Sequence, residues 1–347
     1  MNPNQPSKEP LLKIENLKKH FTVKSGGYFN KKKKVIKAVD DVSFTIYKGE
    51  TLGLVGESGC GKSTLGRNIL RLQEPSGGKV YFNDRNILTY KNRELRKLRK
   101  QMQIIYQDPF SSLNPRFTIG QVIGEMYDIH GFAKGAEKEN RVKEMLELVG
   151  LDPSRNTSFP HEFSGGQRQR VGIARALALN PEFIVADEPV SALDVSVQSQ
   201  VLNLLMKLKK DLGLTMLFIA HGLNVVRHIS DRVGVMYLGK IVELSETDNI
   251  FDSPAHPYTA ALLSTVPEVD PRLKKERIIL KGEVPSPASP PSGCTFRTRC
   301  PLAKERCKAE VPGLTEVRTN HFVSCHYPLE DGQTLKEVIV SRGSVNS

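Results

Sequence analysis

The stretch GESGCGKS, residues 56–63, decides the fold of this chain. It fits the phosphate-binding loop pattern G-x-x-x-x-G-K-[ST], and it lies between an apolar run, residues 51–55, and a helix-like stretch, residues 63–72. A strand, a loop and a helix in that order are the setting in which such a loop holds phosphate. A glycine-rich turn that binds nothing is the alternative, and this setting disfavours it. The sequence therefore predicts an α/β nucleotide-binding fold.

The residues of this loop are expected to divide the work of holding ATP. Glycines let the backbone curl, so that successive N–H groups and the helix N-terminus point at phosphate oxygens. Lys62 is expected to reach the β- and γ-phosphates, and the Ser63 hydroxyl to hold Mg²⁺. Cys60 is interpreted as a small buried residue rather than a reactive thiol. The predicted ATP-binding residues of the loop are Gly56, Glu57, Ser58, Gly59, Cys60, Gly61, Lys62, Ser63 and Thr64.

Two carboxylates follow a second apolar run, in FIVADEP, residues 183–189. Asp187 fits the acidic residue that holds Mg²⁺ through water in P-loop ATPases. Glu188 is then available as the general base that orients and polarises the attacking water. An acidic pair is often only a solvated exit from a strand, but that interpretation is disfavoured in a chain that already has a phosphate-binding loop.

Two more apolar runs end in polar side chains that suit the same reaction. Gln107 follows residues 102–106, and its neutral amide is expected to contact both Mg²⁺ and the attacking water. His221 follows residues 215–220 and is expected to touch the γ-phosphate and Glu188. A lone histidine is more often structural, but its position at the end of a strand in this series favours catalysis.

The stretch FSGGQRQRVGIARAL, residues 163–177, resembles the signature of ATP-binding cassette (ABC) transporters. The resemblance implies that Ser164, Gly165, Gly166 and Gln167 begin a helix and contact the γ-phosphate of ATP on the opposite subunit, and a helix N-terminus is a suitable anion site. It also implies that hydrolysis needs a dimer. Asp194, in SALD, is implied to be the acidic residue of the loop that crosses the dimer interface.

This family resemblance implies the fold class and an adenine contact. The fold class is α/β, a P-loop NTPase with a RecA-like core, an antiparallel β subdomain and an α-helical signature subdomain, plus a small cysteine-containing C-terminal extension. Phe21 is the best match to the aromatic residue that stacks on adenine, and Tyr28 is the alternative because a basic insertion, residues 24–34, intervenes. We interpret that insertion as a solvated charged loop, and contact with anionic lipid headgroups is the alternative.

Two positions depart from the family pattern. Phe163 stands where leucine is usual, and as an apolar residue it is expected only to anchor the start of the helix. Gly222 stands where aspartate is usual, which removes a negative charge beside His221. The catalytic residue types are all present, so the half of the ATP site that this chain supplies is predicted to be active.

The apolar pattern predicts the remaining organisation. Residues 11–51 are expected to supply antiparallel strands, residues 233–237 and 240–244 a hairpin, and residues 195–212 a helix. The apolar stripe of that helix consists of Val201, Leu204, Leu205, Leu208 and Leu212. The predicted domains are a nucleotide-binding domain at 1–265, with a helical subdomain at about 110–165, a cysteine-rich extension at 266–330 and a tail at 331–347.

Three further stretches resemble the branch of the family that imports peptides. They are QDPFSSLNPRFTIGQ at residues 107–121, HPYTAALLSTVP at 256–267 and GEVPSPASPPSGC at 282–294. The resemblance covers residues 11 to about 328 and implies an ATP hydrolase that powers di- or oligopeptide import. It implies a second, non-identical ATPase subunit, two transmembrane permease subunits and an extracytoplasmic substrate-binding protein. Nickel importers share this branch and are the alternative.

Four cysteines lie in the extension: Cys294, Cys300, Cys307 and Cys325. Disulfides are disfavoured in the cytosol, so a metal, an iron–sulfur cluster or separate thiols are the options. The spacing lacks the C-x₂-C pairs of zinc ribbons, which weakens zinc. Four thiolates suit a [4Fe–4S] cluster, and some members of the resembled branch contain one.

Length and charge place the chain among soluble proteins that reach a membrane through partners. No apolar stretch of the 347 residues approaches the roughly 18 that span a bilayer. The N-terminus lacks a targeting pattern, so we expect a peripheral protein at the cytoplasmic face of the cell membrane. The net charge of +12 raises a nucleic-acid-associated ATPase as the alternative. Such ATPases carry long coiled coils, whereas about 100 residues separate Lys62 from Ser164, so no nucleic-acid partner is expected.

Overall fold

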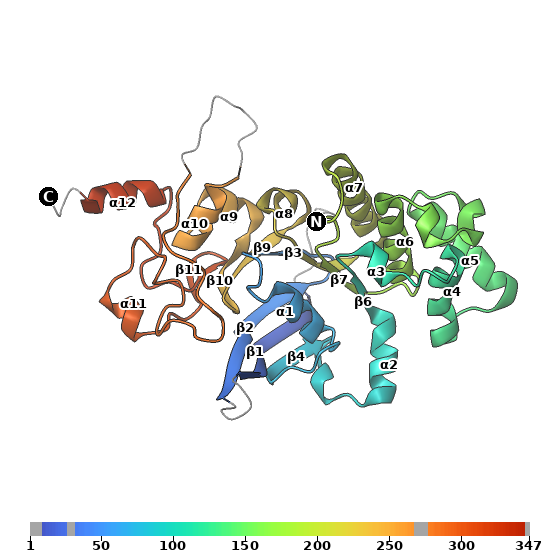
Figure 1. Cartoon of the computed structure of the whole chain (residues 1–347), viewed down its shortest axis with the longest axis horizontal. Coiled ribbons are helices and arrows are strands. Elements are labelled where there is room, and N and C mark those ends of the chain that lie inside the picture. The colour runs from blue at the N-terminus through green and yellow to red at the C-terminus, as the bar shows by residue number, and fades with distance from the viewer. Residues whose placement is uncertain (1–8, 26–31, 267–276, 344–347) are drawn as a thin grey trace. The chain divides into compact units, whose positions relative to one another are not determined.

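A computed structural model describes residues 9–25, 32–266 and 277–343 (Figure 1). The chain forms two compact units. The first unit consists of residues 1–12, 45–51 and 81–220, and the second of residues 13–44, 52–80 and 221–347. In the part of the chain that is described, no helix is long and apolar enough to cross a membrane.

The first unit is built around three parallel strands. β7 (Phe183–Asp187) pairs with β6 (Met102–Ile105) on one side and β8 (Thr215–Ile219) on the other. β7 and β8 are buried along their whole length, which matches their nearly uninterrupted apolar sequences. A short hairpin joins β4 (Gly77–Phe82) to β5 (Arg85–Asn86). Its turn residues, Asn83 and Asp84, both have positive φ, as a two-residue hairpin turn requires.

Helices surround these strands in the first unit. Three of them, α4 (Ile119–His130), α5 (Gly135–Leu148) and α6 (Gly165–Leu177), pack on one another (Figure 1). Thr118 and Gln121 form a capping box at the start of α4, and Gly131 ends it in the left-handed conformation. The other helical segments are α2 (Asn92–Gln101), α3 (Pro109–Ser112), α7 (Val195–Leu212), η1 (Ile87–Thr89), η2 (Pro153–Thr157) and η3 (Pro160–Glu162).

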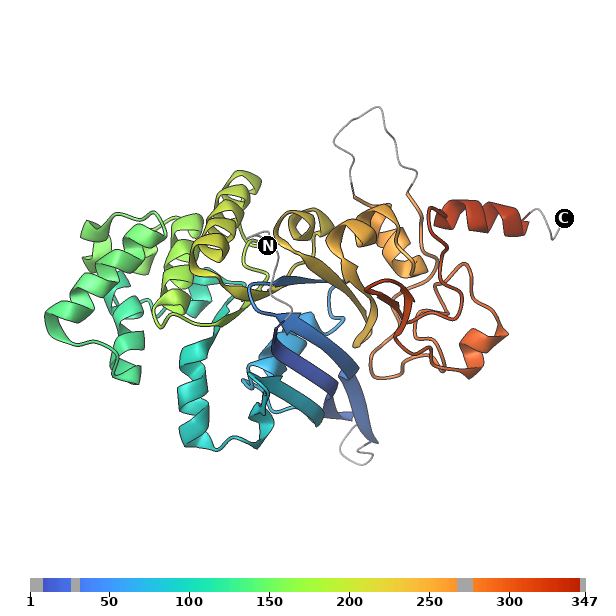
Figure 2. The same ribbon diagram turned by 180° about the vertical axis from the view of Figure 1, so that it is seen from behind.

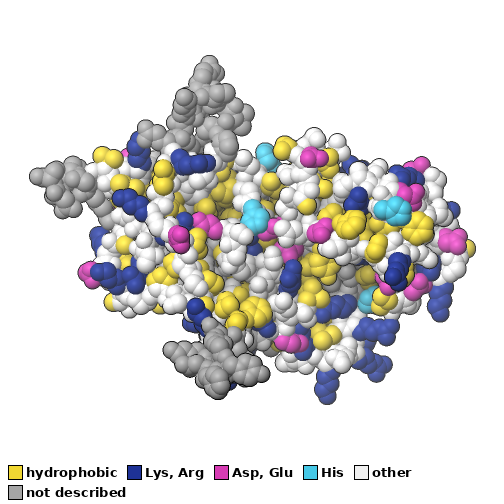
Figure 3. Space-filling model, viewed as in Figure 1, with side chains coloured by type: hydrophobic (Ala, Val, Ile, Leu, Met, Phe, Trp, Pro, Cys, Tyr) yellow, Lys and Arg dark blue, Asp and Glu magenta, His cyan; other side chains and the backbone are white. Residues whose placement is uncertain are grey.

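Helix α2 carries much of the basic charge on the face seen in Figure 3, where Lys and Arg side chains gather over it. Part of that charge is structural. Arg96 donates a hydrogen bond to the Ile129 carbonyl, and Lys100 donates one to the His130 carbonyl over 3.1 Å. Cations at a helix C-terminus satisfy carbonyl groups that have no partner within the helix. These basic residues therefore cap α4.

The second unit contains a mixed sheet. β3 (Thr51–Val55), whose first residue belongs to the first unit, pairs in parallel with β9 (Arg232–Tyr237). β9 pairs antiparallel with β10 (Lys240–Glu246), which confirms the predicted hairpin; its turn is formed by Leu238 and Gly239. β12 (His321–Val323) adds antiparallel to β10, and β11 (Thr315–Arg318) adds to β12.

The remaining strands and helices complete this unit. β1 (Pro10–Ser25) lies between β2 (Lys32–Tyr47) and β4 in a second sheet, and most of these residues belong to the second unit. The helices are α1 (Lys62–Ile69), α8 (Leu223–Ile229), α9 (Thr247–Asp252), α10 (Pro257–Leu263), α11 (Glu305–Ala309) and α12 (Leu335–Gly343). Figure 2 shows that the orange and red segments after α10 lie next to β10.

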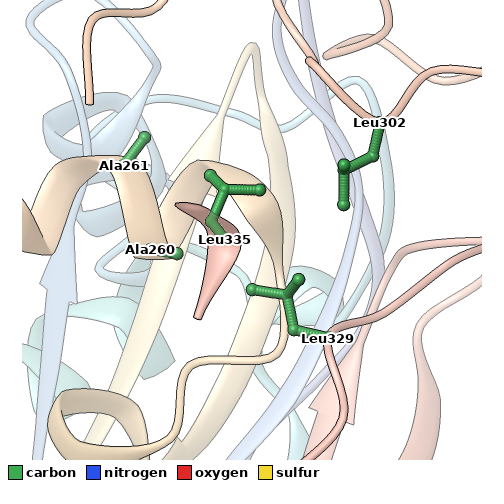
Figure 4. Packing of buried hydrophobic residues seen from close by; sticks show 5 residues of the cluster. All are labelled: Ala260, Ala261, Leu302, Leu329 and Leu335. Carbon is green, nitrogen blue, oxygen red and sulfur yellow. The ribbon is translucent and has the colours of Figure 1, made fainter. Parts of the chain in front are cut away.

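A small apolar cluster attaches the C-terminal segments to α10. Figure 4 shows its five buried members: Ala260, Ala261, Leu302, Leu329 and Leu335. Leu335, in α12, is 1% exposed, so the segment predicted as a tail contributes to a core. Backbone hydrogen bonds add to this attachment, from Leu329 to Ala255 and from Ser324 to Val242, each over 2.8 Å.

Most predicted elements are confirmed within two residues at their ends, and two details are wrong. Helix α1 ends at Ile69 rather than at residue 72. In α7, Val201, Leu205 and Leu208 are buried as predicted, but Leu212 is 48% exposed. Because Gly213 is the left-handed C-cap of α7, Leu212 lies in the final turn, beyond the face that packs on the unit.

Candidate functional site

The predicted phosphate-binding loop joins the buried end of β3 to the start of α1. Gly56, Gly59 and Gly61 all have positive φ, which disfavours other residues. Space is equally limited, because a Cβ on Gly56 would lie 2.2 Å from the Met236 carbonyl oxygen. A Cβ on Gly61 would lie 1.9 Å from the Ala38 carbonyl oxygen. Both conformation and packing therefore require glycine at these two positions.

Lys62 lies over the loop as a P-loop lysine should. It is buried, and its Nζ donates hydrogen bonds to the carbonyl oxygens of Gly56 over 2.8 Å and Glu57 over 3.2 Å. Ser63 and Thr64 follow in the first turn of α1, where backbone N–H groups lack partners within the helix. A buried ammonium beside a helix N-terminus makes this end of the unit suitable for a polyphosphate. Cys60 is buried as predicted, and burial raises the pKa of its thiol.

His221 shares a cavity with the phosphate-binding loop. The cavity measures about 300 Å³, and its lining includes Gly56, Glu57 and His221, with Leu262 of α10 and Val266 shortly after that helix. The structure thus brings together two of the predicted parts of the site. The predicted contact of His221 with Glu188 joins residues of different units and stays a prediction.

The strand-end carboxylates lie in the first unit. Asp187 and Glu188 are 2% and 5% exposed. Glu188 has a φ of 50°, rare for a residue with a side chain, and its N–H donates to the Ile219 carbonyl over 3.0 Å. The Gln107 Nε2 donates to Glu188 Oε2 over 2.8 Å. Two residues predicted to share one reaction, 81 positions apart, are thus in direct contact.

The signature residues form the start of α6. Ser164 is its N-cap, and it exchanges hydrogen bonds with Gln167 in a capping box: Ser164 Oγ accepts from the Gln167 N–H over 3.3 Å, and Gln167 Oε1 accepts from the Ser164 N–H over 3.0 Å. Ser164 and Gly165 are exposed, whereas Phe163 is buried, as expected of an anchor. A Cβ on Gly166 would lie 2.3 Å from Val197 of α7, so the glycine lets these helices approach.

Three further predicted residues are the interface aspartate and the two candidates for the adenine contact. Asp194 is exposed at the N-cap position of α7. Phe21, in β1, is half-buried, and the Lys19 Nζ lies 5.0 Å from the centroid of its ring. Tyr28, the alternative adenine contact, lies outside the described residues, as does part of the basic insertion at 24–34.

The four cysteines of the extension line one small cavity of about 10 Å³. Cys294 and Cys307 are buried, and Cys300 and Cys325 are half-buried. Burial raises the pKa of Cys294, and it raises that of Cys325 to about 12. His256, Phe296 and His326 also line the cavity. Among the described residues, no group of three or more His, Cys, Asp or Glu side chains has an arrangement that could hold a metal ion.

Sequence reasoning missed two residues that contact the phosphate-binding loop. The Tyr258 hydroxyl accepts a hydrogen bond from the Glu57 N–H over 3.1 Å, and Arg299 forms an ion pair with the Glu57 carboxylate. Tyr258 belongs to the HPYT stretch, which indicates the family resemblance but no contact with the loop. Arg299 lies 242 residues from Glu57, and no local pattern indicates such a contact.

These features define the class of protein: a P-loop ATPase with a signature helix and a C-terminal extension. The family model described as ABC transporter matches residues 39–191. A second model, described as oligopeptide/dipeptide transporter, C-terminal region, matches residues 242–307. That second match contains both Tyr258 and Arg299.

Curated relatives match almost from end to end. The chain is 55% identical to the oligopeptide transport ATP-binding protein AppF of Bacillus subtilis, over 92% of this chain and 98% of that protein. It is 53% identical to a putative peptide import ATP-binding protein of Brucella ovis, over 91% and 97% of the two chains. The chain belongs to the oligopeptide and dipeptide transport branch of the ABC-transporter ATPases.

A solved structure supports the fold. It is a dimeric ATP-binding cassette in a post-hydrolysis state, bound to ADP and phosphate. It superposes with a TM-score of 0.60 and 30% identity, over 68% of this chain and 98% of the other. The predicted P-loop NTPase fold and ABC-type ATPase activity are therefore confirmed at the level of the family.

Proposed function

We propose that this chain hydrolyses ATP to power the import of di- or oligopeptides through a membrane permease. The observation that carries this proposal is the joining of a phosphate-binding loop to the C-terminal region matched at residues 242–307. The curated relatives are named for oligopeptide transport and peptide import, which favours peptides over nickel.

Within one half-site, each predicted residue has a chemical role. Lys62 and the N-terminus of α1 bind the phosphates, and Glu188 removes a proton from the attacking water. Gln107 orients Glu188 through their hydrogen bond. Asp187 and the Ser63 hydroxyl are the residues that would hold Mg²⁺, because a buried carboxylate and a hydroxyl are oxygen donors of the kind it prefers. When bound, Mg²⁺ would neutralise charge on the phosphates.

The second half of each ATP site comes from a partner subunit in this proposal. The exposed start of α6, with Ser164 and Gly165, supports that role because a helix N-terminus attracts anions. Asp194 is also exposed and is available to an interface. The partners are a second homologous ATPase, two permease subunits and a substrate-binding protein, and they hold the chain at the cytoplasmic face of the membrane.

The cysteine cavity is proposed to hold a [4Fe–4S] cluster, with zinc as the alternative. Four thiols lining one cavity are the donor set that such a cluster uses. The described arrangement does not itself form a metal site, so binding would require the side chains to reorient. The role proposed is structural: cross-links within a segment too short and too proline-rich to build a large core.

The experiment that tests the transport proposal compares two cargoes in one strain. Cells that lack this subunit are complemented with the wild-type chain or with Glu188→Gln, and uptake of a labelled tripeptide and of radiolabelled nickel is measured. Loss of tripeptide uptake in the variant, with nickel uptake unchanged, supports the proposal. Loss of nickel uptake alone would favour the alternative cargo, and unchanged uptake of both would refute a transport role for this chain.

A further inference from the structure

Arg299, in the C-terminal extension, forms a two-point ion pair with Glu57 of the phosphate-binding loop. Its Nη1 lies 2.8 Å from Glu57 Oε2, and its Nη2 lies 3.0 Å from Oε1. The Arg299 side chain is 9% exposed and that of Glu57 is 27% exposed. Paired, partly buried contacts of this kind are the strongest and most directional that an arginine makes. The extension is thus bonded directly to the loop predicted to bind ATP.

A second contact holds the backbone of the same residue. The Tyr258 hydroxyl accepts from the Glu57 N–H over 3.1 Å, and burial raises the pKa of Tyr258, which keeps the phenol neutral. Its ring packs against Tyr237, with centroids 4.7 Å apart, and against Phe296, at 5.4 Å. Phe296 also lines the cysteine cavity, so aromatic contacts connect that cavity through Tyr258 to the loop.

These contacts bear on nucleotide binding for two reasons. A carboxylate in a loop that binds a polyanion opposes binding unless a cation neutralises it, and Arg299 supplies that cation. The loop is also rich in glycine, including Gly56 at a φ of 151°, and because glycine is free to adopt many conformations, contacts from outside the loop are needed to hold one of them. Tyr258 holds the loop through the main-chain N–H of Glu57, and Arg299 holds it through the Glu57 carboxylate.

We propose that Arg299 is a positioning residue for the ATP site, and that the C-terminal extension holds the phosphate-binding loop in its nucleotide-binding conformation through Arg299 and Tyr258. The inference rests on the proposed role of this loop in binding ATP, and it does not depend on the transported cargo or on a metal in the cysteine cavity. Arg299 acts through Glu57 and is not assigned a contact with ATP.

The test is a double-mutant cycle on the full chain in its assembled complex. Arg299→Gln leaves the Glu57 carboxylate without its cation and is expected to raise the KM for ATP by about tenfold, with a smaller change in kcat. Arg299→Lys keeps the charge but loses the two-point geometry, so an intermediate KM is expected. Glu57→Gln combined with Arg299→Gln removes both charges and should recover most of the lost affinity, because no unpaired charge remains.

Arg297→Gln is the matched control. Arg297 lies two residues away in the same segment, lines the cysteine cavity, and donates to the Ser292 carbonyl over 2.8 Å. The Arg297→Gln variant should leave the KM for ATP unchanged. Binding of a fluorescent ATP analogue, measured without turnover, gives a second readout, and thermal unfolding of each variant shows whether the chain is folded.

The outcomes separate this inference from the proposed function. If the wild-type chain fails to bind the ATP analogue, the proposed ATPase role fails. If the wild type binds it and Arg299→Gln, folded, binds equally well, only this inference is overturned. Strictly additive effects of Glu57→Gln and Arg299→Gln on the KM for ATP would also overturn this inference. They would mean that the ion pair is not coupled to nucleotide binding.

Discussion

Gln107 donates a hydrogen bond from its Nε2 to Oε2 of Glu188 over 2.8 Å. The contact joins the segment after β6 to the end of β7, and both side chains come from the edge of the sheet at which the parallel strands end. Glu188 is 5% exposed, and the amide restricts the direction of its carboxylate. A buried carboxylate with a fixed orientation suits a general base, and the first prediction follows from this.

Glu188→Gln is expected to bind ATP while lowering its hydrolysis by about 10²–10⁴-fold, the usual contribution of a positioned base. The substitution keeps the shape of the side chain and removes its basicity. Steady-state phosphate release and binding of an ATP analogue give the two readouts. Glu182→Gln is the control, because Glu182 precedes β7 and bonds Asn83 and Gln101. Near-normal hydrolysis by Glu188→Gln would contradict the assignment.

A second prediction concerns the exposed N-terminus of α6. Ser164→Arg places a bulky cation where the proposal seats the γ-phosphate of ATP bound to the partner, and it removes the capping hydroxyl. In the assembled heterodimer, hydrolysis at the partner's phosphate-binding loop should fall, while ATP binding at this chain's own loop persists. Photolabelling with an ATP analogue distinguishes the two sites. Loss confined to this chain's own site would refute the shared-site arrangement.

Helix packing beside that N-terminus gives a third prediction. Gly166→Ala would place a Cβ 2.3 Å from Val197, and overpacking of this kind lowers the free energy of unfolding by about 1–3 kcal/mol. Gly172→Ala is the control in the same helix. In the described part of the chain, no neighbouring atom lies within 4 Å of the Cβ it would add. Because alanine is the better helix former, this control should raise stability by up to about 1 kcal/mol. Urea unfolding of both variants checks the difference, and equal stability would show that α6 and α7 adjust freely.

The elements that carry catalysis were predictable because their signals are local. FIVAD, TMLFI and TLGLV are short runs of mostly apolar residues that lead into predicted site residues, and each forms a strand with the predicted start and with an end within one residue. Ser164 and Gln167 show the spacing of a capping box, which starts a helix by itself. Proximity of Gln107 to Glu188 follows from their shared position at the ends of adjacent parallel strands.

The bracing of the phosphate-binding loop was not predictable, because it depends on contacts between distant segments. Arg299 lies in a stretch with little regular structure, and Glu57 is one of many carboxylates in the sequence. Only the folded extension brings them together. The exposed Leu212 has a local cause instead: periodicity places it on the apolar face of α7, whereas Gly213 ends the helix there and the chain turns toward β8.

A fourth prediction concerns pH and the buried cap of α10. His256 is 1% exposed, and its Nδ1 accepts from the Tyr258 N–H over 3.0 Å. Burial lowers the pKa of His256 from 6.5 to about 4, against the opposing influence of the Glu243 carboxylate. Glu243 accepts from the N–H groups of Ala255 and His256 and lies 2.7 Å from the His321 Nε2. His256 is therefore neutral in the folded chain near pH 7.

The sign of the pH dependence follows from that lowered pKa. The unfolded chain binds a proton at this histidine below about pH 6.5, whereas the folded chain does so only near pH 4. Stability is thus full above pH 6.5 and falls by about 3 kcal/mol as the pH drops to 4. His256→Asn keeps a cap acceptor without this titration, so its unfolding free energy should depend less steeply on pH between 6.5 and 4. Equal slopes for the two proteins would contradict the prediction.

The last prediction concerns the cysteine cavity. Cys294, Cys300, Cys307 and Cys325 line it together, and burial raises the pKa of Cys294 and Cys325. Buried thiols are inert without a cation to stabilise their thiolates, whereas a metal centre would deprotonate them and cross-link the segment. Protein purified without oxygen should be brown, absorb near about 400 nm and contain about four iron atoms per chain.

Single serine substitutions localise the metal. Cys325→Ser should lose the iron and unfold at a lower temperature, because the cross-link between β12 and the preceding loops is removed. Cys60→Ser should retain the iron, since Cys60 lies in the phosphate-binding loop and outside the cavity lining. One zinc per chain in colourless protein would replace the cluster with a structural zinc site. Metal-free protein in which all four thiols react with a thiol reagent would exclude both, and the apolar cluster around Leu335 and the contacts of β12 with β10 would then hold the extension without a metal.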